Sequence, residues 1–128
     1  MNKTQKPFSK TNLIARSALQ LVAALRREQV SPHELLDALE KQISLVDGVI
    51  NALPTLCFER ARKHADTLMQ KPPSQRGLLC GLPVAIKDLN QVAGVIISMG
   101  SPIFKGRVAS NSDYMVEQIE KQGGIIYA

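Results

Sequence analysis

The sequence predicts an α/β fold in which N-terminal helices are followed by the first strands of a mixed sheet. Before residue 71, apolar residues recur mainly at three- and four-residue spacing, as they do in amphipathic helices. After residue 77, short apolar runs rich in β-branched residues lie between glycines, which is typical of strands. The chain closes on a helix, Gly123-Gly124 and four largely apolar residues, half of a β-α-β unit. Because this last strand stops after four residues, we expect the sheet to be incomplete.

Two helices are expected in the first fifty residues. Apolar residues over 13–29 form a single helical stripe. Ser31 then provides an N-cap, Pro32 suits the first helical position, and Glu34 completes a capping box. We interpret Gly48 as the stop signal of this second helix.

Two further helices and three strands are expected in the rest of the chain. The helices are predicted over residues 59–69 and 112–122. Strands are predicted over residues 82–86 and 125–128, and residues 92–99 are expected to contain another, with Gly94 as a bend.

The length of 128 residues is that of one domain. We expect residues 1–11 to be a flexible tail and residues 12–128 to belong to a single domain. Within that domain, a Pro-Pro loop near residue 72 separates a helical region, 12–71, from the start of a sheet core, 77–128.

Composition excludes several classes of function. The net charge of +5 is spread along the chain without a basic run, so we expect no specific nucleic-acid partner. No apolar stretch approaches the length of a membrane span and no signal peptide is recognisable, so we expect a cytoplasmic protein without a membrane partner. The cysteines and histidines lack metal-ligand spacing, so no metal and no cofactor is expected; they are Cys57, Cys80, His33 and His64.

The segment GLPVAIKDLNQVAG places Lys87 at the end of an apolar strand. At such a position the alkyl part of a lysine side chain can pack against apolar residues while its ammonium group reaches water. Asp88 would then be either an oppositely charged neighbour of Lys87 or an acceptor for loop N–H groups. In an apolar wall, however, the neutral amine is favoured, and it is a competent general base. Strand ends are also where α/β proteins place their chemistry. Ser98 and Ser101 lie within possible reach, but neither sits in a recognisable nucleophile turn.

These residues resemble the segment around the catalytic lysine of the amidase-signature family. The flanks are similar too, including the helix start at Ser31 and the helix that ends in Gly123-Gly124, so the resemblance extends over about residues 12–128. The specific part is the lysine segment, whose matching positions are Gly77, Gly81, Leu82, Pro83, Val84, Ala85, Ile86, Lys87, Asp88, Ala93, Gly94, Ser98, Gly100 and Ser101.

The resemblance implies a Ser–cis-Ser–Lys triad in which Lys87 is the neutral general base. The family's two serines lie in a Gly/Ser-rich segment further along the chain, and no such segment occurs in these residues, so Ser98 and Ser101 do not match them. Ile97 stands where the family often has threonine. Met99 stands where a small residue precedes Gly-Ser, and it could narrow a substrate cleft.

The function implied is that of the N-terminal fragment of an amidase that hydrolyses a carboxamide to a carboxylate and ammonia or an amine. With only Lys87 of the triad present, we expect the chain alone to be inactive. The expected partners are a small-molecule amide in the full-length protein and a second copy or another subunit. An amidotransferase component is a subtype of this hypothesis. The alternative is a stand-alone binding or assembly module, a remnant of an enzyme.

Overall fold

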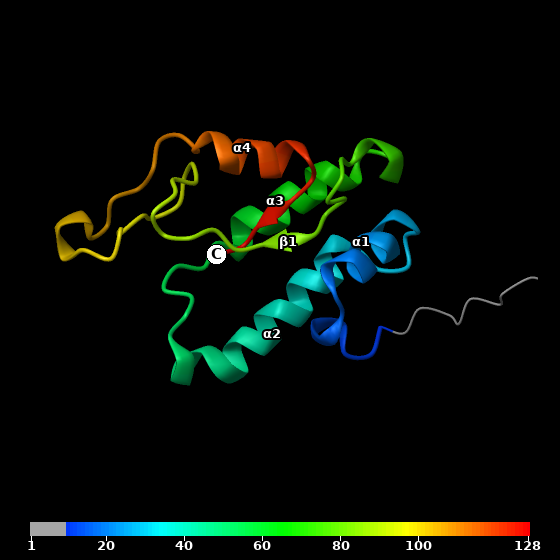
Figure 1. The fold of residues 1–128 in the computed structure, drawn as a ribbon, viewed down its shortest axis with the longest axis horizontal. Coiled ribbons are helices and arrows are strands. Elements are labelled where there is room, and N and C mark those ends of the chain that lie inside the picture. The colour runs from blue at the N-terminus through cyan, green and yellow to red at the C-terminus, as the bar shows by residue number, and fades with distance from the viewer. Residues whose placement is uncertain (1–9) are drawn as a thin grey trace, which may run out of the picture.

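The computed structural model describes residues 10–128, so most of the tail predicted over residues 1–11 lies outside the described residues. Within them, four helices surround a small parallel sheet (Figure 1). The elements follow in the order η1 (Leu13–Ala15), α1 (Ala18–Arg26), α2 (Pro32–Ile50), α3 (Phe58–Met69), η2 (Pro73–Gln75), β1 (Pro83–Val84), η3 (Pro102–Phe104), α4 (Tyr114–Lys121) and β2 (Ile125–Ile126).

The helix predicted over residues 13–29 is divided into η1 and α1. Arg16 and Ser17 are extended between them, and Ser17 is the N-cap of α1. The Ser17 hydroxyl accepts a hydrogen bond from the Gln20 N–H at 3.3 Å, while the Gln20 side chain accepts one from the Ser17 N–H at 3.0 Å. Ser17 and Gln20 thus form a capping box. It satisfies N–H groups that a continuous helix would have bonded internally, which explains the break between η1 and α1.

Helix α2 begins as predicted and ends later than predicted. Ser31 and Glu34 form the expected capping box, with the Glu34 N–H donating to the Ser31 hydroxyl at 3.2 Å. The expectation that Gly48 ends the helix is wrong, because α2 continues to Ile50. The stop lies instead at Asn51, whose φ of 54° is left-handed. The Asp47 side chain fastens this end by accepting the Ala52 N–H at 2.8 Å.

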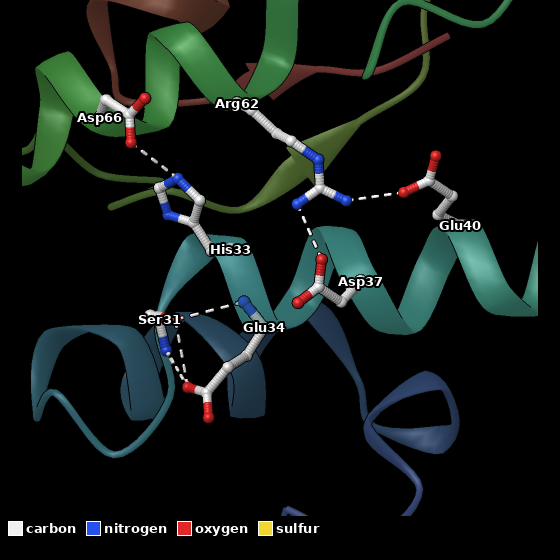
Figure 2. Close-up of polar contacts among 7 residues, drawn as sticks. All are labelled: Ser31, His33, Glu34, Asp37, Glu40, Arg62 and Asp66. Carbon is white, nitrogen blue, oxygen red and sulfur yellow. Dashed lines mark hydrogen bonds and ion pairs between the residues drawn. The ribbon is translucent and has the colours of Figure 1, made fainter. Parts of the chain in front are cut away.

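Helices α2 and α3 pack against each other, and charged side chains join them at the surface (Figure 2). Arg62 of α3 donates to Asp37 at 2.7 Å and to Glu40 at 2.6 Å, both on α2. His33 of α2 lies 2.8 Å from Asp66 of α3. Below these pairs, Leu36 and Phe58 belong to a buried cluster with Ala61, Ala65, Leu68 and Ile125.

The sheet is formed by β1 and β2, which run parallel with Pro83 opposite Ile125. The strand predicted over residues 82–86 is shorter than expected, although its hydrogen bonds continue to the Ile86 N–H, which donates to the Ala128 carbonyl at 2.9 Å. On the other side of β2, the Cys57 N–H donates to the Tyr127 carbonyl at 2.8 Å. The segment 125–128 therefore lies between two neighbours.

The prediction of a strand within residues 92–99 is wrong. In the described chain this segment forms turns and one isolated antiparallel bridge, between Ile96 and Val108, and backbone hydrogen bonds around the bridge join residues 94–97 to residues 107–109. Its side chains do not alternate between two faces of a sheet: Val92 and Val95 pack in one cluster with Val116 of α4 and Ile126 of β2. The loop then projects from the helices and carries η3 at its tip (Figure 1).

The helix predicted over residues 112–122 begins two residues late, at Tyr114. The polar residues ahead of it bond to another segment: the Ser112 hydroxyl accepts the Ala93 N–H at 2.9 Å, and the Asp113 carboxylate accepts the Gln91 N–H at 3.0 Å. After α4, Gly123 has a φ of +79°, and a Cβ there would lie 1.8 Å from the Arg76 carbonyl oxygen. Only glycine fits this crossing of the chain into β2.

Candidate active site

Lys87 lies three residues beyond β1, at the carboxyl end of the small parallel sheet. The hydrogen bond from Ile86 to Ala128 brings the end of the β2 segment beside it. A cleft of about 280 Å³ opens at this edge, between the segment that follows α2 and the loop that follows β1. Its lining is mostly apolar, with Lys87, Asp88 and Asn90 among Ala52, Leu53, Pro54, Thr55, Ile86, Val92, Val95, Ile96 and Ala128.

The Lys87 side chain is exposed, as in the alternative that sends its ammonium group to water and unlike the desolvated amine of the other alternative. Apolar residues line the cleft around it, but the described residues do not enclose it. Within residues 10–128, no carboxylate forms an ion pair with its ammonium group; the ion pairs found there involve other cations. The described chain therefore positions Lys87 at the expected edge without removing it from water.

Asp88 turns away from Lys87 and binds the turn formed by residues 98–101. Its carboxylate accepts hydrogen bonds from the Ser98 hydroxyl and, at 2.9 Å, from the Ser98 N–H. The Ser98 hydroxyl lowers the pKa of the Asp88 carboxyl most, and the N–H groups of Ser98, Gly100 and Met99 lower it further. Of the roles considered from the sequence, the structure confirms that of an acceptor for loop N–H groups.

The turn bound by Asp88 has an unusual backbone. Met99 has a φ of 51° and Gly100 a φ of 68°, and the Ser101 N–H closes the turn by donating to the Ser98 carbonyl at 2.9 Å. Two successive left-handed residues identify a type I′ turn, in which methionine is uncommon. The Ser101 hydroxyl accepts the Ile103 N–H at 3.4 Å. Both serine hydroxyls that lay within possible reach of Lys87 are thus engaged in local contacts.

A second carboxylate, that of Asp113, holds the other side of the loop. It accepts the Gln91 N–H at 3.0 Å and the Asn90 side-chain amide at 3.3 Å. Sequence reasoning identified neither Asn90 nor Asp113 as part of the site. The available signal was an aspartate just before a helix, which predicts a helix cap rather than a contact to a distant loop.

Arg60 of α3 bonds to the loop that follows Lys87, at Ala93. Its Nε donates to the Ala93 carbonyl at 3.2 Å, and its Nη1 lies 2.6 Å from Glu120 of α4. His64 lies beside this pair, with its Nδ1 3.6 Å from the Glu120 carboxylate, and burial lowers the pKa of its imidazole. Burial raises the pKa of the Cys57 thiol and so disfavours the reactive thiolate at this position.

Neither a metal site nor a membrane span is found in the part of the chain that the structure describes. No group of three or more histidine, cysteine or acidic side chains there is arranged to hold a metal ion. None of the helices over residues 10–128 has the length and apolarity needed to cross a membrane.

A family model described as Amidase matches residues 34–128. This chain belongs to the amidase family. The match includes Lys87 and its whole segment, so the resemblance to the amidase-signature family inferred from these residues is confirmed. The α/β fold class predicted for the chain is also confirmed, as that of a partial amidase fold.

Individual relatives cover the chain well but extend far beyond it. A glutamyl-tRNA(Gln) amidotransferase component of Halothermothrix orenii is 33% identical over 101 residues, 79% of this chain and 20% of that protein. An acylamidase of Rhodococcus erythropolis is 27% identical over 120 residues, 92% of this chain and 25% of that protein. This amidase-family chain therefore spans a fifth to a quarter of the length of these curated relatives.

A solved structure has the same arrangement of elements. It was described as an unexpected vestigial protein complex that reveals the evolutionary origins of an s-triazine catabolic enzyme. Its TM-score is 0.79 at 25% identity, and the superposition covers 88% of this chain and 25% of that one.

Proposed function

We propose that this chain is the N-terminal part of an amidase and supplies its general base, Lys87. The observation that carries the proposal is the position of Lys87 at the carboxyl edge of β1, on an open cleft, inside the segment that matches the amidase family. On this proposal, residues 12–128 form the first part of a single amidase domain. The protein acts in the cytoplasm, where its free cysteines, Cys57 and Cys80, stay reduced.

The reaction is the hydrolysis of a carboxamide to a carboxylate and ammonia or an amine. A serine attacks the amide carbon, and its proton passes through a bridging serine to the neutral amine of Lys87. The C–N bond then breaks, the leaving nitrogen takes a proton, and water releases the acyl group from the serine. Both serines are expected in the part of the protein that follows these residues.

The proposal requires the Lys87 amine to lose most of its water in the whole protein. The described residues leave the side chain exposed. The relatives are four to five times longer than the region they share with this chain, so they have ample chain with which to cover the cleft. Removing water favours the neutral amine, which is the form that can accept a proton.

The test is the release of ammonia from simple carboxamides by the protein made from its complete reading frame. We expect Lys87→Ala and Lys87→Arg to abolish hydrolysis, because neither side chain can accept a proton at neutral pH. Lys41→Ala, at an exposed position of α2, is the matched control. The 128-residue chain by itself is expected to show no hydrolysis. Measurable turnover by the 128-residue chain, or full activity of Lys87→Ala, would refute the proposal.

A second candidate function is that of a binding or assembly module whose partner is a second copy or another subunit. The observation that favours it is the last part of α2, where Leu45, Val49 and Ile50 are 69%, 90% and 63% exposed. A monodisperse chain that unfolds cooperatively would support this module. A chain that aggregates would favour the fragment, because such apolar surface is then left bare.

A further inference from the structure

We propose that Asp88 is a positioning residue, which holds the turn at residues 98–101 against the segment of Lys87 and keeps its own carboxylate away from the lysine. Its importance for catalysis rests on the proposed role of Lys87 as the base. The inference about position stands on the contacts of Asp88 alone.

The first support is the direction of the Asp88 carboxylate. Both oxygens of Asp88 bond to Ser98, one to its hydroxyl and one to its N–H. The Met99 and Gly100 N–H groups also lower the pKa of this carboxyl, while the Gly100 N–H itself donates to the Ser98 hydroxyl at 3.3 Å. Because Ser98 engages both carboxylate oxygens, the Lys87 ammonium group would have to compete with its two donors.

The second support is the effect that a released carboxylate would have on Lys87. A carboxylate that pairs with an amine favours its protonated form, which cannot act as a base. A lysine base next to an aspartate in sequence therefore needs that aspartate to be engaged elsewhere. The turn at residues 98–101 provides that engagement, and Ser98 provides two of its donors.

The third support is the backbone of the turn itself. Met99 is held at a φ of 51°, a conformation that side-chain-bearing residues rarely adopt. Such a residue persists where the surroundings over-determine it, and these residues cluster at functional sites. Met99 and Gly100 share a shallow hollow with Lys87, Asp88 and Leu89, so the turn bound by Asp88 lies beside the lysine.

The experiment compares the reactivity of two lysines in the same 128-residue chain. Wild type, Ser98→Ala, Ser98→Thr and Asp66→Asn are acetylated with acetic anhydride at a series of alkaline pH values, and the ratio of Lys87 to Lys41 is read by mass spectrometry. Ser98→Ala changes no charge but removes the hydroxyl that bonds Asp88 Oδ2, so this oxygen becomes available to pair with Lys87, while Oδ1 keeps the backbone N–H of residue 98. We expect Lys87 to react about two- to fivefold more slowly than in wild type at a given pH, with its midpoint moved to higher pH.

The two remaining variants serve as controls. Ser98→Thr keeps the hydroxyl and is expected to restore the wild-type ratio. Asp66→Asn removes a carboxylate between α2 and α3, and we expect it to leave the ratio unchanged. Circular dichroism checks that the Ser98→Ala chain is folded. If the pH midpoint of Lys87 acetylation in this folded variant equals that of wild type, the proposal is overturned, because an Asp88 with only a structural role would not affect the reactivity of Lys87.

If Ser98→Ala unfolds, amide hydrogen exchange of the wild-type chain tests the proposed role of Asp88 instead. The Ser98 N–H, which donates to Asp88 at 2.9 Å, should exchange with solvent more slowly than the N–H of Gly106 in the same projecting loop, for which no hydrogen bond is found among the described residues. Equal exchange overturns the proposal. Neither acetylation nor hydrogen exchange depends on hydrolysis. The positioning role of Asp88 can therefore be refuted while Lys87 remains the base, and the base role of Lys87 can be refuted while Asp88 still positions the turn.

Discussion

Helices α2 and α3 are joined by a buried apolar cluster and by charged pairs at the surface, whereas the loop beside Lys87 is held mainly by two carboxylates and a few backbone hydrogen bonds. The packing of α2 against α3 is stabilised by many contacts, so the loss of one contact leaves the others in place. In the loop, Asp88 and Asp113 each accept two hydrogen bonds. The site is therefore the region in which a single side chain has the largest local effect.

The largest expected effect on global stability comes from the buried cluster of the helical pair. Leu36 is fully buried there, so Leu36→Ala removes packed methyl groups and leaves a cavity. We expect a loss of about 2–5 kcal/mol in the free energy of unfolding, measured by urea denaturation. Leu19→Ala, at an exposed position of α1, is the control. A loss below about 1 kcal/mol would contradict the packing described for α2 and α3.

The next effect concerns the loop. Asp88→Asn replaces a carboxylate that accepts several hydrogen bonds, each of a kind that contributes about 1.5–3 kcal/mol when one partner is charged. We expect the variant to unfold more easily at neutral pH and the Ser98 N–H to exchange faster.

The effect of Asp88→Asn should depend on pH, and its direction follows from the lowered pKa of Asp88 in the folded chain. A lowered folded-state pKa contributes stability above the unfolded value, near 3.8, and that stability is lost as the pH falls through the folded-state pKa. Wild type and variant should therefore converge in acid. A difference that persists in strong acid would show that the charge of Asp88 is not its source.

A smaller effect is expected at the start of α2. Ser31→Ala removes the hydroxyl that accepts the Glu34 N–H, and N-cap losses of this kind cost about 1 kcal/mol. Thermal denaturation measures the loss, and Ser31→Thr should recover most of it because threonine also caps helices. If Ser31→Ala were neutral, the capping box would not be formed in solution.

Met99→Gly is expected to act in the opposite direction. Its left-handed backbone is unfavourable for methionine by about 1 kcal/mol, and glycine removes that strain. The greater flexibility of glycine in the unfolded chain offsets part of the gain, so we expect a net stabilisation of about 0.5 kcal/mol. Chemical denaturation would detect it, and a destabilised variant would show that the Met99 side chain stabilises the turn by packing.

The smallest effect is expected at the surface of the helical pair. Arg62→Met removes two ion pairs between α3 and α2 but keeps an unbranched side chain (Figure 2). Exposed pairs contribute about 0–1 kcal/mol and are screened by salt. We expect a loss within this range at low ionic strength that decreases in high salt. A large loss that salt does not change would mean that Arg62 acts through packing.

The same contrast explains which features could be predicted from the sequence. The start of α2 was predictable because Ser31 and Glu34, which form its cap, are three residues apart. The strand over residues 92–99 was predicted wrongly, because whether a β-branched run forms a ladder depends on distant partners. Here Val92 packs on α4 and β2 instead. Gly48 was misread as a stop because the actual stop, Asn51, depends on a contact from Asp47.

The family of the Lys87 segment could be predicted from the sequence, whereas the contacts around it could not. The match to the amidase family covers that segment, and the role of Lys87 as the base stays a prediction. The direction of Asp88 and the participation of Asp113 depend on hydrogen bonds across ten and 22 residues of chain. Periodicity and capping rules describe neighbours within a few residues, so contacts of this length lie beyond them.

The position of residues 125–128 between β1 and Cys57 has a consequence for synthesis. The Cys57 thiol also donates to the Ile126 carbonyl at 3.6 Å, a contact across 69 residues of chain. Both neighbours of β2 therefore leave the ribosome long before β2 does. Helices α2 and α3 are close in sequence and can pair early, since local contacts close short loops. The edge that carries Lys87 cannot assemble until residues 125–128 have been translated. Until then, the β1 segment requires protection from aggregation, so we expect nascent chains shorter than this to depend on chaperones.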